Sequence, residues 1–468
     1  MKNAYQILML ALVGILAVGT AYAQTQVPFI ISTNQTWTAA GSPYMVTGNV
    51  LVEEGVKLTI QPGATVISSD HKLRIIVDGE VYAVGTKDSA IEFQKGSFEF
   101  TDKSVGYDPT TSTGSQFRYC LFLGNNQSSG YRAIYLKETP MMVSHCKFMD
   151  EYYCIYFQAY KDTFDLTVEN CVFRGVTMTY GYPVYMSSST SAKHTLYFTD
   201  NYCENMNGMY LAGHAELKKN TFRNFSGNGG IRMSSNYKYI KLECNLFENF
   251  KYNMFDVSYA APNATLEMTY NTFDTADVFI QSYSSSGIPA NMTIRYNNFL
   301  NFRKNSVEFR GGTTPGQADT IDFQQNYWGT TNTADIDAGI KDFRDDITVN
   351  KLVDYGSYLS AQVTACSGGG TIGGADTTGS QGNVSVREFA TGELTIFPNP
   401  AHAMVTVQAS NGTINRVVLM DLSGKVLIDQ EVDAVSALLD VQHIANGTYV
   451  LSTEQNGTTI RQKLIVAH

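Results

Sequence analysis

Charged residues are scarce in this chain of 468 residues: they form 16% of the sequence, against roughly 25% in an average globular protein. Basic residues are the smaller group, 33 against 43 acidic ones, and the formal net charge is -10. The low charge, together with 12% aromatic residues, excludes an extended disordered polyelectrolyte and predicts a large core. The acidic balance disfavours nucleic acid or an anionic membrane surface as the main partner.

Long apolar runs are absent after the N-terminus. The N-terminus itself predicts a signal peptide over residues 1–23. It combines the positive charge of Lys2, an apolar run at residues 7–18 and a small-x-small cleavage sequence at residues 21–23. A retained membrane anchor over residues 5–19 is the alternative. No later apolar stretch reaches the 18 residues of a membrane span, so we expect an exported mature chain without a transmembrane segment.

Motifs of common catalytic and metal sites are also missing. The histidines show no His-x-x-His spacing, and no Gly-x-Ser-x-Gly or phosphate-binding glycine loop occurs. The seven cysteines form no Cys-x-x-Cys pair, so we expect them mainly as small buried apolar side chains. The alternative is a disulfide between two of Cys120, Cys146 and Cys171.

Cofactors are therefore not expected. One acidic cluster leaves calcium as an alternative, although a solvated turn is the favoured interpretation because no Asp-x-Asp-x-Asp-Gly loop is present. The cluster consists of Asp335, Asp337, Asp342, Asp345 and Asp346.

A short motif, an asparagine or cysteine followed two residues later by an aromatic residue, repeats along the middle of the chain. Its anchors are Cys120, Cys146, Cys171, Asn201, Asn220, Asn245, Asn271, Asn297 and Asn326, at intervals of 19 to 30 residues. Only Cys203 interrupts the column of aromatic followers. Apolar residues alternate before and after each anchor, which is typical of strands. Two or three short strands per repeat and no helical period predict a parallel β-helix with coils about 4.8 Å apart.

Columns of equivalent residues follow from this arrangement. We expect the asparagine anchors to occupy one turn of successive coils, where they tolerate left-handed backbone geometry and hydrogen-bond to their stacked neighbours. On the outward side, Glu216, Lys241 and Glu267 alternate in sign, which helps to hold the register of adjacent strands.

Four tyrosines lie between inward apolar pairs of consecutive repeats: Tyr135, Tyr156, Tyr185 and Tyr210. They predict an outward aromatic stripe that binds carbohydrate, because exposed aromatic surface usually marks a binding site. The alternative is structural, since stacked tyrosines also stabilise neighbouring strands. Further hydrogen-bond donors are expected nearby from Tyr160, Lys161, Tyr180, Tyr182, Lys193 and His194.

Five segments resemble those of a known family: residues 43–48, 56–63, 76–79 and 83–86, and the closing segment 326–330. The family is the secreted right-handed parallel β-helix family, which includes pectate-lyase-like enzymes and binding proteins. The resemblance covers about residues 35–358, and we assign residues 24–360 to this domain. The resemblance implies that an enzyme of this family would use either an Arg or Lys residue as base together with calcium, or a pair of carboxylates. The outward columns offer Arg232, Asp256 and Glu308, and Lys218, Glu243 and Arg295, but no pair compels either mechanism.

Residues 361–392 are rich in Gly, Ser and Thr and predict a linker. Residues 393–468 contain short alternating strands that predict a small β-sandwich. Within it, residues 397–400, 421–426, 439–441, 446–450 and 463–465 resemble the type IX secretion sorting domain. This resemblance implies the type IX machinery as a partner and a secreted or outer-membrane cell-surface location.

The sequence thus predicts an all-β protein, a right-handed parallel β-helix followed by a linker and a β-sandwich. We expect it to bind carbohydrate or to act as a surface adhesion module. A polysaccharide lyase or glycoside hydrolase is the alternative, with no catalytic residue assigned.

Overall fold

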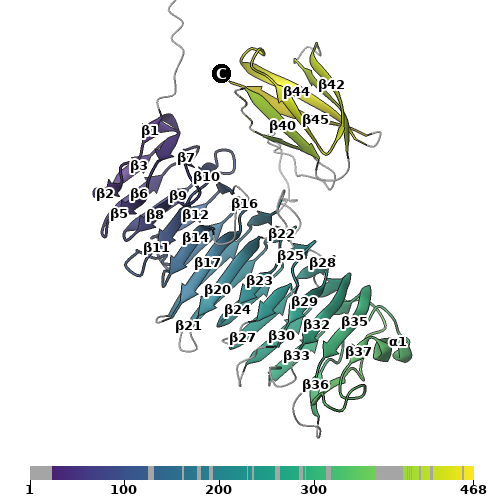
Figure 1. The fold of residues 1–468 in the computed structure, drawn as a ribbon. Helices are drawn as coiled ribbons and strands as arrows, with labels where there is room; N and C mark the ends of the chain where they lie inside the picture. Colours follow the sequence, from purple (N-terminus) through teal and green to yellow (C-terminus); the bar gives the residue numbers. More distant parts are fainter. Residues whose placement is uncertain are drawn as a thin grey trace, which may run out of the picture. The chain divides into compact units, whose positions relative to one another are not determined.

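The chain consists of two compact units, residues 1–370 and residues 371–468 (Figure 1). Each unit has its own hydrophobic core. The structure is a computed structural model. It describes residues 24–124, 131–160, 163–175, 181–188, 193–228, 230–233, 237–258, 264–283, 288–289, 291–311, 318–364, 366, 394–397, 399, 401, 403–409, 413–421, 425–455 and 458–467.

Three long parallel sheets form the first unit, and successive coils contribute strands to each of them in turn. Sheet A contains, in stacking order, β1 (Thr25–Gln26), β4 (Tyr44–Val46), β7 (Thr65–Ser68), β10 (Ile91–Gln94), β13 (Cys120–Leu123), β16 (Lys147–Met149), β19 (Val172–Arg174), β22 (Tyr202–Glu204), β25 (Thr221–Arg223), β28 (Leu246–Glu248), β31 (Thr272–Asp274) and β34 (Asn298–Phe299).

Sheet B follows sheet A along each coil. It contains β2 (Ile30–Ile31), β5 (Val50–Val52), β8 (Arg74–Val77), β11 (Ser97–Phe100), β14 (Arg132–Lys137), β17 (Tyr153–Ala159), β20 (Tyr182–Ser188), β23 (Met209–Leu211), β26 (Ile231–Met233), β29 (Asn253–Asp256), β32 (Ala276–Ser282), β35 (Phe302–Phe309) and β37 (Ile340–Lys341).

Sheet C completes the coils. It contains β3 (Gln35–Trp37), β6 (Lys57–Ile60), β9 (Glu80–Val84), β12 (Gln116–Arg118), β15 (Met141–Ser144), β18 (Thr163–Glu169), β21 (Lys193–Thr199), β24 (His214–Lys218), β27 (Tyr239–Glu243), β30 (Thr265–Thr269), β33 (Asn291–Arg295), β36 (Asp319–Asp322) and β38 (Lys351–Asp354). A short 3-10 helix, η1 (Ala39–Gly41), and one α-helix, α1 (Thr333–Ala338), interrupt the strands.

The predicted β-helix is confirmed, and the inward columns lie where the alternating pattern places them. In sheet C, Ile240 pairs with Leu266, and Leu242 pairs with Met268; all four side chains are buried. Inside the coils the aromatic followers stack face to face. Phe122, Phe148 and Phe173, for example, have ring centroids 4.6 and 4.9 Å apart. The core is therefore continuous from coil to coil, as a repeat that cannot bury its own apolar face requires.

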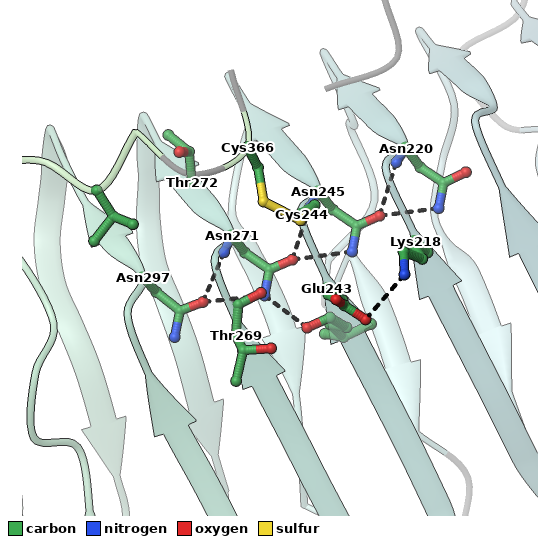
Figure 2. Close-up of a disulfide and its surroundings, with 12 residues drawn as sticks. Lys218, Asn220, Glu243, Cys244, Asn245, Thr269, Asn271, Thr272, Asn297 and Cys366 are labelled. Atoms are coloured by element: carbon green, nitrogen blue, oxygen red, sulfur yellow. Dashed lines mark hydrogen bonds and ion pairs between the residues drawn. A yellow bond between two sulfur atoms is a disulfide. The ribbon is translucent and has the colours of Figure 1, made fainter. Parts of the chain in front are cut away.

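Buried asparagines form a continuous ladder at the turn between sheets C and A (Figure 2). The Oδ1 atom of Asn271 accepts the backbone N–H of Asn245 at 2.9 Å and its side-chain amide at 2.9 Å. The amide of Asn271 donates to Leu242 O and to the Oδ1 atom of Asn297. Each side chain thus satisfies a backbone group that the turn would leave unpaired in the interior.

The left-handed backbone geometry lies one residue before the expected position. Each anchor is preceded by a residue whose φ is between 50° and 61°: Tyr119, His145, Asn170, Asp200, Lys219, Cys244, Tyr270, Tyr296 and Gln325. The prediction that the anchors themselves take this geometry is wrong. The preceding residue makes the turn, and the side chain of the anchor then points inward.

The cysteine anchors extend the asparagine ladder toward the N-terminus. Cys120, Cys146 and Cys171 are buried and free, as are Cys154 and Cys203, so these five behave as the expected small apolar side chains. A disulfide among the first three, the alternative prediction, is wrong. The junction with the asparagines is a hydrogen bond from Cys171 N to the Oδ1 atom of Asn201 at 2.9 Å.

One disulfide does form, between Cys244 and Cys366, and the sequence analysis missed it (Figure 2). Cys366 belongs to a return segment, residues 357–364 with Cys366, that runs back from the last coil. Its Leu359 N–H donates to Asn326 O, and Val363 exchanges two hydrogen bonds with the Asn298 side chain. Val363 and Cys366, which the sequence places in the linker, are thus attached to the β-helix.

The second unit is the predicted small sandwich. One sheet contains β39 (Leu394–Phe397), β40 (Met404–Ala409) and β43 (Ser436–Asp440). The other contains β42 (Val426–Ala434), β41 (Ile414–Met420), β44 (Gly447–Gln455) and β45 (Thr458–Val466). All pairs are antiparallel, and both sheets contribute to one buried core.

Replacing a ladder asparagine should destabilise the β-helix. In Asn271→Ala, two donors of Asn245 lose their acceptor in the interior, at about 1–3 kcal/mol for each unsatisfied group. We expect a loss of several kcal/mol in urea unfolding. The control is Asn291→Ala at the exposed start of β33, which should change stability by less than about 0.5 kcal/mol. Equal losses of stability in the two variants would show that the asparagine ladder does not stabilise the β-helix.

Removing the disulfide should loosen the C-terminal coils. The bond closes a loop with a sequence separation of 122, for which chain entropy predicts a contribution of roughly 4–5 kcal/mol. We expect Cys366→Ser to lower the unfolding midpoint, and reductant to lower that of the wild type but not of the variant. A wild type insensitive to reductant would show that the bond does not form.

Candidate functional site

The four predicted tyrosines occupy one outward column of sheet B. Tyr135 pairs with Tyr156, Tyr156 with Tyr185, and Tyr185 with Tyr210 in the strand register. All four side chains are half-buried, whereas their chain neighbours on either side are buried in the core.

Their rings form a stack along the axis of the β-helix. The ring centroids of Tyr156 and Tyr185 are 5.1 Å apart with 14° between the planes, and those of Tyr185 and Tyr210 are 4.8 Å apart with 11°. The Tyr135 ring meets the Tyr156 ring edge-on, at 5.4 Å and 88°. The column therefore ends in a perpendicular ring rather than continuing as a uniform stack.

Three further tyrosines widen this column. Tyr153 stacks on Tyr182, with ring centroids 5.4 Å apart, and makes an edge-to-face contact with Tyr185 at 5.1 Å. Tyr152 packs on Tyr153 with centroids 4.7 Å apart. We call these seven residues the tyrosine face: Tyr135, Tyr152, Tyr153, Tyr156, Tyr182, Tyr185 and Tyr210.

Strict alternation of strand residues concealed the wider face. In β17, Cys154 and Ile155 are both buried, so Tyr153 and Tyr156 both point outward although two residues rather than one lie between them. β14 repeats this break, with Ala133 buried next to an inward isoleucine. Small residues at the extra inward position were the available signal.

Cations lie against the N-terminal end of the face. The guanidinium of Arg132 lies over two rings, 4.4 Å from the centroid of Tyr135 and 4.3 Å from that of Tyr156. Glu99, the residue before Tyr135 in the column, pairs with Arg74 and Lys137. Burial would raise the pKa of Glu99, but the hydrogen bonds and charges of these two cations lower it below its ordinary value.

Polar groups border the rings on the next outward column. The Tyr135 hydroxyl donates to Gln158, whose amide donates to the Tyr160 hydroxyl at 2.7 Å. That hydroxyl lies 3.3 Å from Ser187 Oγ, and Tyr160 is 44% exposed. Aromatic faces and exchangeable hydroxyls thus alternate across adjacent columns.

The other residues expected to donate hydrogen bonds differ in their exposure. Tyr182 belongs to the face. His194 is buried at 1% exposure, packs on Phe157, and burial lowers its pKa to about 4, so its expected role as a donor at the surface is wrong. Lys161, Tyr180 and the side chain of Lys193 lie outside the described part of the structure.

The acidic candidates occupy the same column of sheet B, farther along. Arg232 follows Tyr210 and precedes Asp256, Gln281 and Glu308. Both carboxylates are nearly buried: Asp256 accepts from Ser258, and Glu308 accepts from Arg310 at 2.9 Å. They have partners within the fold, and neither is presented to a ligand as an open pair.

The other charged candidates, Lys218, Glu243 and Arg295, form ion pairs on the outward side of sheet C. Lys218 pairs with Glu243 at 3.5 Å, and Glu243 also contacts Lys241 at 3.2 Å. Arg295, two coils beyond Glu243, pairs instead with Asp322. Lys218 and Glu243 thus form an ion pair between neighbouring strands, whereas Lys241 pairs along its own strand with Glu243 rather than with Glu216 or Glu267, its neighbours in the alternating column.

The aspartates proposed for calcium are also engaged. Asp342 is buried and accepts from Arg344 and from Val353 N, and Asp346 accepts from Thr348. Across the ranges that the structure describes, no group of three or more His, Cys, Asp or Glu side chains is arranged to hold a metal ion.

Comparison with protein families identifies both units. Residues 132–326 match the right-handed β-helix region, and residues 395–467 match the secretion system C-terminal sorting domain. The chain is a secreted right-handed β-helix protein. The sorting domain directs it through type IX secretion to the cell surface or the extracellular space. No curated protein matches the chain. Within the described residues, no helix has the length and apolar character needed to cross a membrane.

One buried acid lies beside the tyrosine face of the β-helix. Glu151 immediately precedes Tyr152 and is 9% exposed. It packs closely on Gly124: a Cβ atom added to Gly124 would lie 2.8 Å from the carboxyl carbon of Glu151. Burial, with a smaller contribution from the charge of Asp150, raises the pKa of Glu151 to about 8. The carboxyl is therefore neutral at pH 7.

This acid makes stability fall with rising pH. The unfolded chain releases the Glu151 proton near its ordinary pKa of 4.5, whereas the folded chain keeps it until about pH 8. Between these values the folded state binds the extra proton, so stability drops by about 1.4 kcal/mol per pH unit. The buried His194 titrates lower and makes stability rise with pH only between about 4 and 6.5.

We therefore expect wild-type stability to fall by about 2 kcal/mol between pH 6.5 and 8, and Glu151→Gln to abolish most of this fall. Urea unfolding at the two pH values measures it. Glu54→Gln, which removes an exposed carboxylate, should keep the wild-type slope. The same slope in Glu151→Gln would mean that Glu151 is ionised in the fold.

Proposed function

We propose that this secreted surface protein binds an extracellular polysaccharide through the tyrosine face of its β-helix. The observation that carries the proposal is the stacked column of Tyr156, Tyr185 and Tyr210, whose rings are half-buried at the surface and are bordered by hydrogen-bonding side chains on the next outward column. Flat aromatic rings with adjacent hydroxyl and amide groups suit sugars, which present apolar ring faces and hydroxyls together.

A purely structural role explains the column less well. The interior already stacks phenylalanines from coil to coil, so cohesion does not require a second aromatic ladder outside. In sheet C the corresponding outward column places the opposite charges of Glu216, Lys241 and Glu267 in register without any aromatic ring. Strand register therefore does not require exposed apolar rings, and their presence at the surface favours a ligand-binding role.

The length of the column suits a polymer. Tyr135 and Tyr210 are three coil steps apart, about 14 Å at roughly 4.8 Å per step. A glycan that lies along the axis would contact one ring per coil. Lyase or hydrolase activity is the alternative function, and the engaged states of Asp256 and Glu308 give it less support.

Changing Tyr156 and Tyr185 together to Ser should weaken polysaccharide binding by at least about tenfold, if each ring contributes about 1 kcal/mol. Affinity would be measured on a panel of dextran, mannan, xylan, carboxymethyl-dextran and dextran sulfate, together with assays for new reducing ends and unsaturated products. Product formation would favour the enzymatic alternative.

The matched control is Tyr270→Ser with Tyr296→Ser. These rings are also stacked and half-buried, 5.3 Å apart with 8° between planes, but they lie at the turn before the asparagine ladder. We expect the control pair to keep full affinity. Intact binding in the Tyr156 and Tyr185 variant, with a lowered melting temperature, would leave only the structural role.

A further inference from the structure

Two arginines, Arg132 and Arg232, bracket the tyrosine column. In the portions of the chain described, no carboxylate oxygen lies within 4 Å of the Arg132 or the Arg232 guanidinium, whereas nearby Arg74 and Lys137 both pair with Glu99. Arg232 is exposed and donates a hydrogen bond to the backbone carbonyl of Asn228.

Arg132 is the more constrained of the two. Its guanidinium lies over the Tyr135 and Tyr156 rings, and its buried Nε atom has no hydrogen-bond partner among the residues that the structure describes. Contact with the rings offsets part of the cost of removing the charge from water. The plane of the guanidinium is thus fixed while its charge stays uncompensated. A fixed planar fork of this kind matches the two oxygens of a carboxylate or sulfate.

The two cations lie at opposite ends of the ring stack. In the register of sheet B, the order is Tyr135, Tyr156, Tyr185, Tyr210 and then Arg232. Arg132 lies in the coil of Tyr135, so four coil steps, about 19 Å, separate the two arginines. The rings between them carry no charge.

We propose that the polysaccharide is anionic and lies along the β-helix axis, with acidic groups on Arg132 and Arg232 and sugar rings on the tyrosines between them. This inference rests on the proposed function of the tyrosine face. It adds the charge of the ligand, its direction and a minimum length, because a chain shorter than the span between the arginines reaches only one of them. The shared chemistry is a carboxylate or sulfate on a sugar.

The test uses the full chain and three probes with one backbone: dextran, carboxymethyl-dextran and dextran sulfate. We expect the two anionic probes to bind more tightly than dextran, and size-fractionated anionic oligomers to gain affinity until they span both arginines. Arg132→Gln and Arg232→Gln should each weaken anionic binding by about tenfold or more, since hydrogen bonds to charged groups are worth about 1.5–3 kcal/mol. Whichever anionic probe responds more strongly distinguishes carboxylate from sulfate recognition.

Lys341→Gln is the control for net charge. Lys341 is exposed on the same outward column, paired with Glu308 in register, and lies far from the rings. Its replacement should leave binding unchanged. Arg132→Lys keeps the charge but loses the planar fork, and we expect intermediate affinity at an unchanged melting temperature.

The two proposals fail separately. Equal affinity of the arginine variants and the wild type for the anionic probes, or tightest binding of neutral dextran, would overturn the anionic inference while the tyrosine variants still test the face itself. Full binding by the Tyr156 and Tyr185 double variant would overturn the proposed function. Absence of binding to both anionic probes would also overturn the inference.

Discussion

The constant distance between coils is the constraint on which the rest of this molecule depends. Parallel strands must stay about 4.8 Å apart at every turn, and the turn between sheets C and A is where the backbone leaves that pattern. There, the Asn245 N–H is bonded by Asn271, and the Asn271 N–H by Asn297, so the buried amides repair each break with one repeated geometry. Where the amides end, cysteines fill the same column and Cys171 joins the two kinds of anchor.

Fixed register turns a one-dimensional repeat into ordered surfaces. Because residues at equivalent positions stack, tyrosines in successive coils become a ring column, and a change to Arg232 and Asp256 in later coils becomes a change of surface chemistry along the axis. The return segment that ends at Cys366 secures the C-terminal coils. A rigid scaffold of this kind presents its outward groups at low entropic cost to a ligand.

The sequence predicted whatever depends on local period. Alternation placed the four tyrosines outward between inward apolar pairs, because both directions follow from the two-residue repeat of a strand. It missed the Cys244–Cys366 bond, since that depends on where the chain returns after its last coil. It missed Tyr153 because two successive residues are buried beside it, and it misplaced His194, whose strand position faces the core.

The central claim, that the tyrosine column is a ligand-binding face, is tested most directly by hydroxyl-radical footprinting of the full chain with and without bound polysaccharide. Side-chain oxidation reports exposure, and Tyr197, 38% exposed on sheet C, serves as an internal reference. The account predicts that saturating polysaccharide lowers oxidation of Tyr156 and Tyr185 several-fold and leaves Tyr197 unchanged. Unchanged oxidation of Tyr156 and Tyr185 in the bound protein, or an equal decrease at Tyr197, would contradict it.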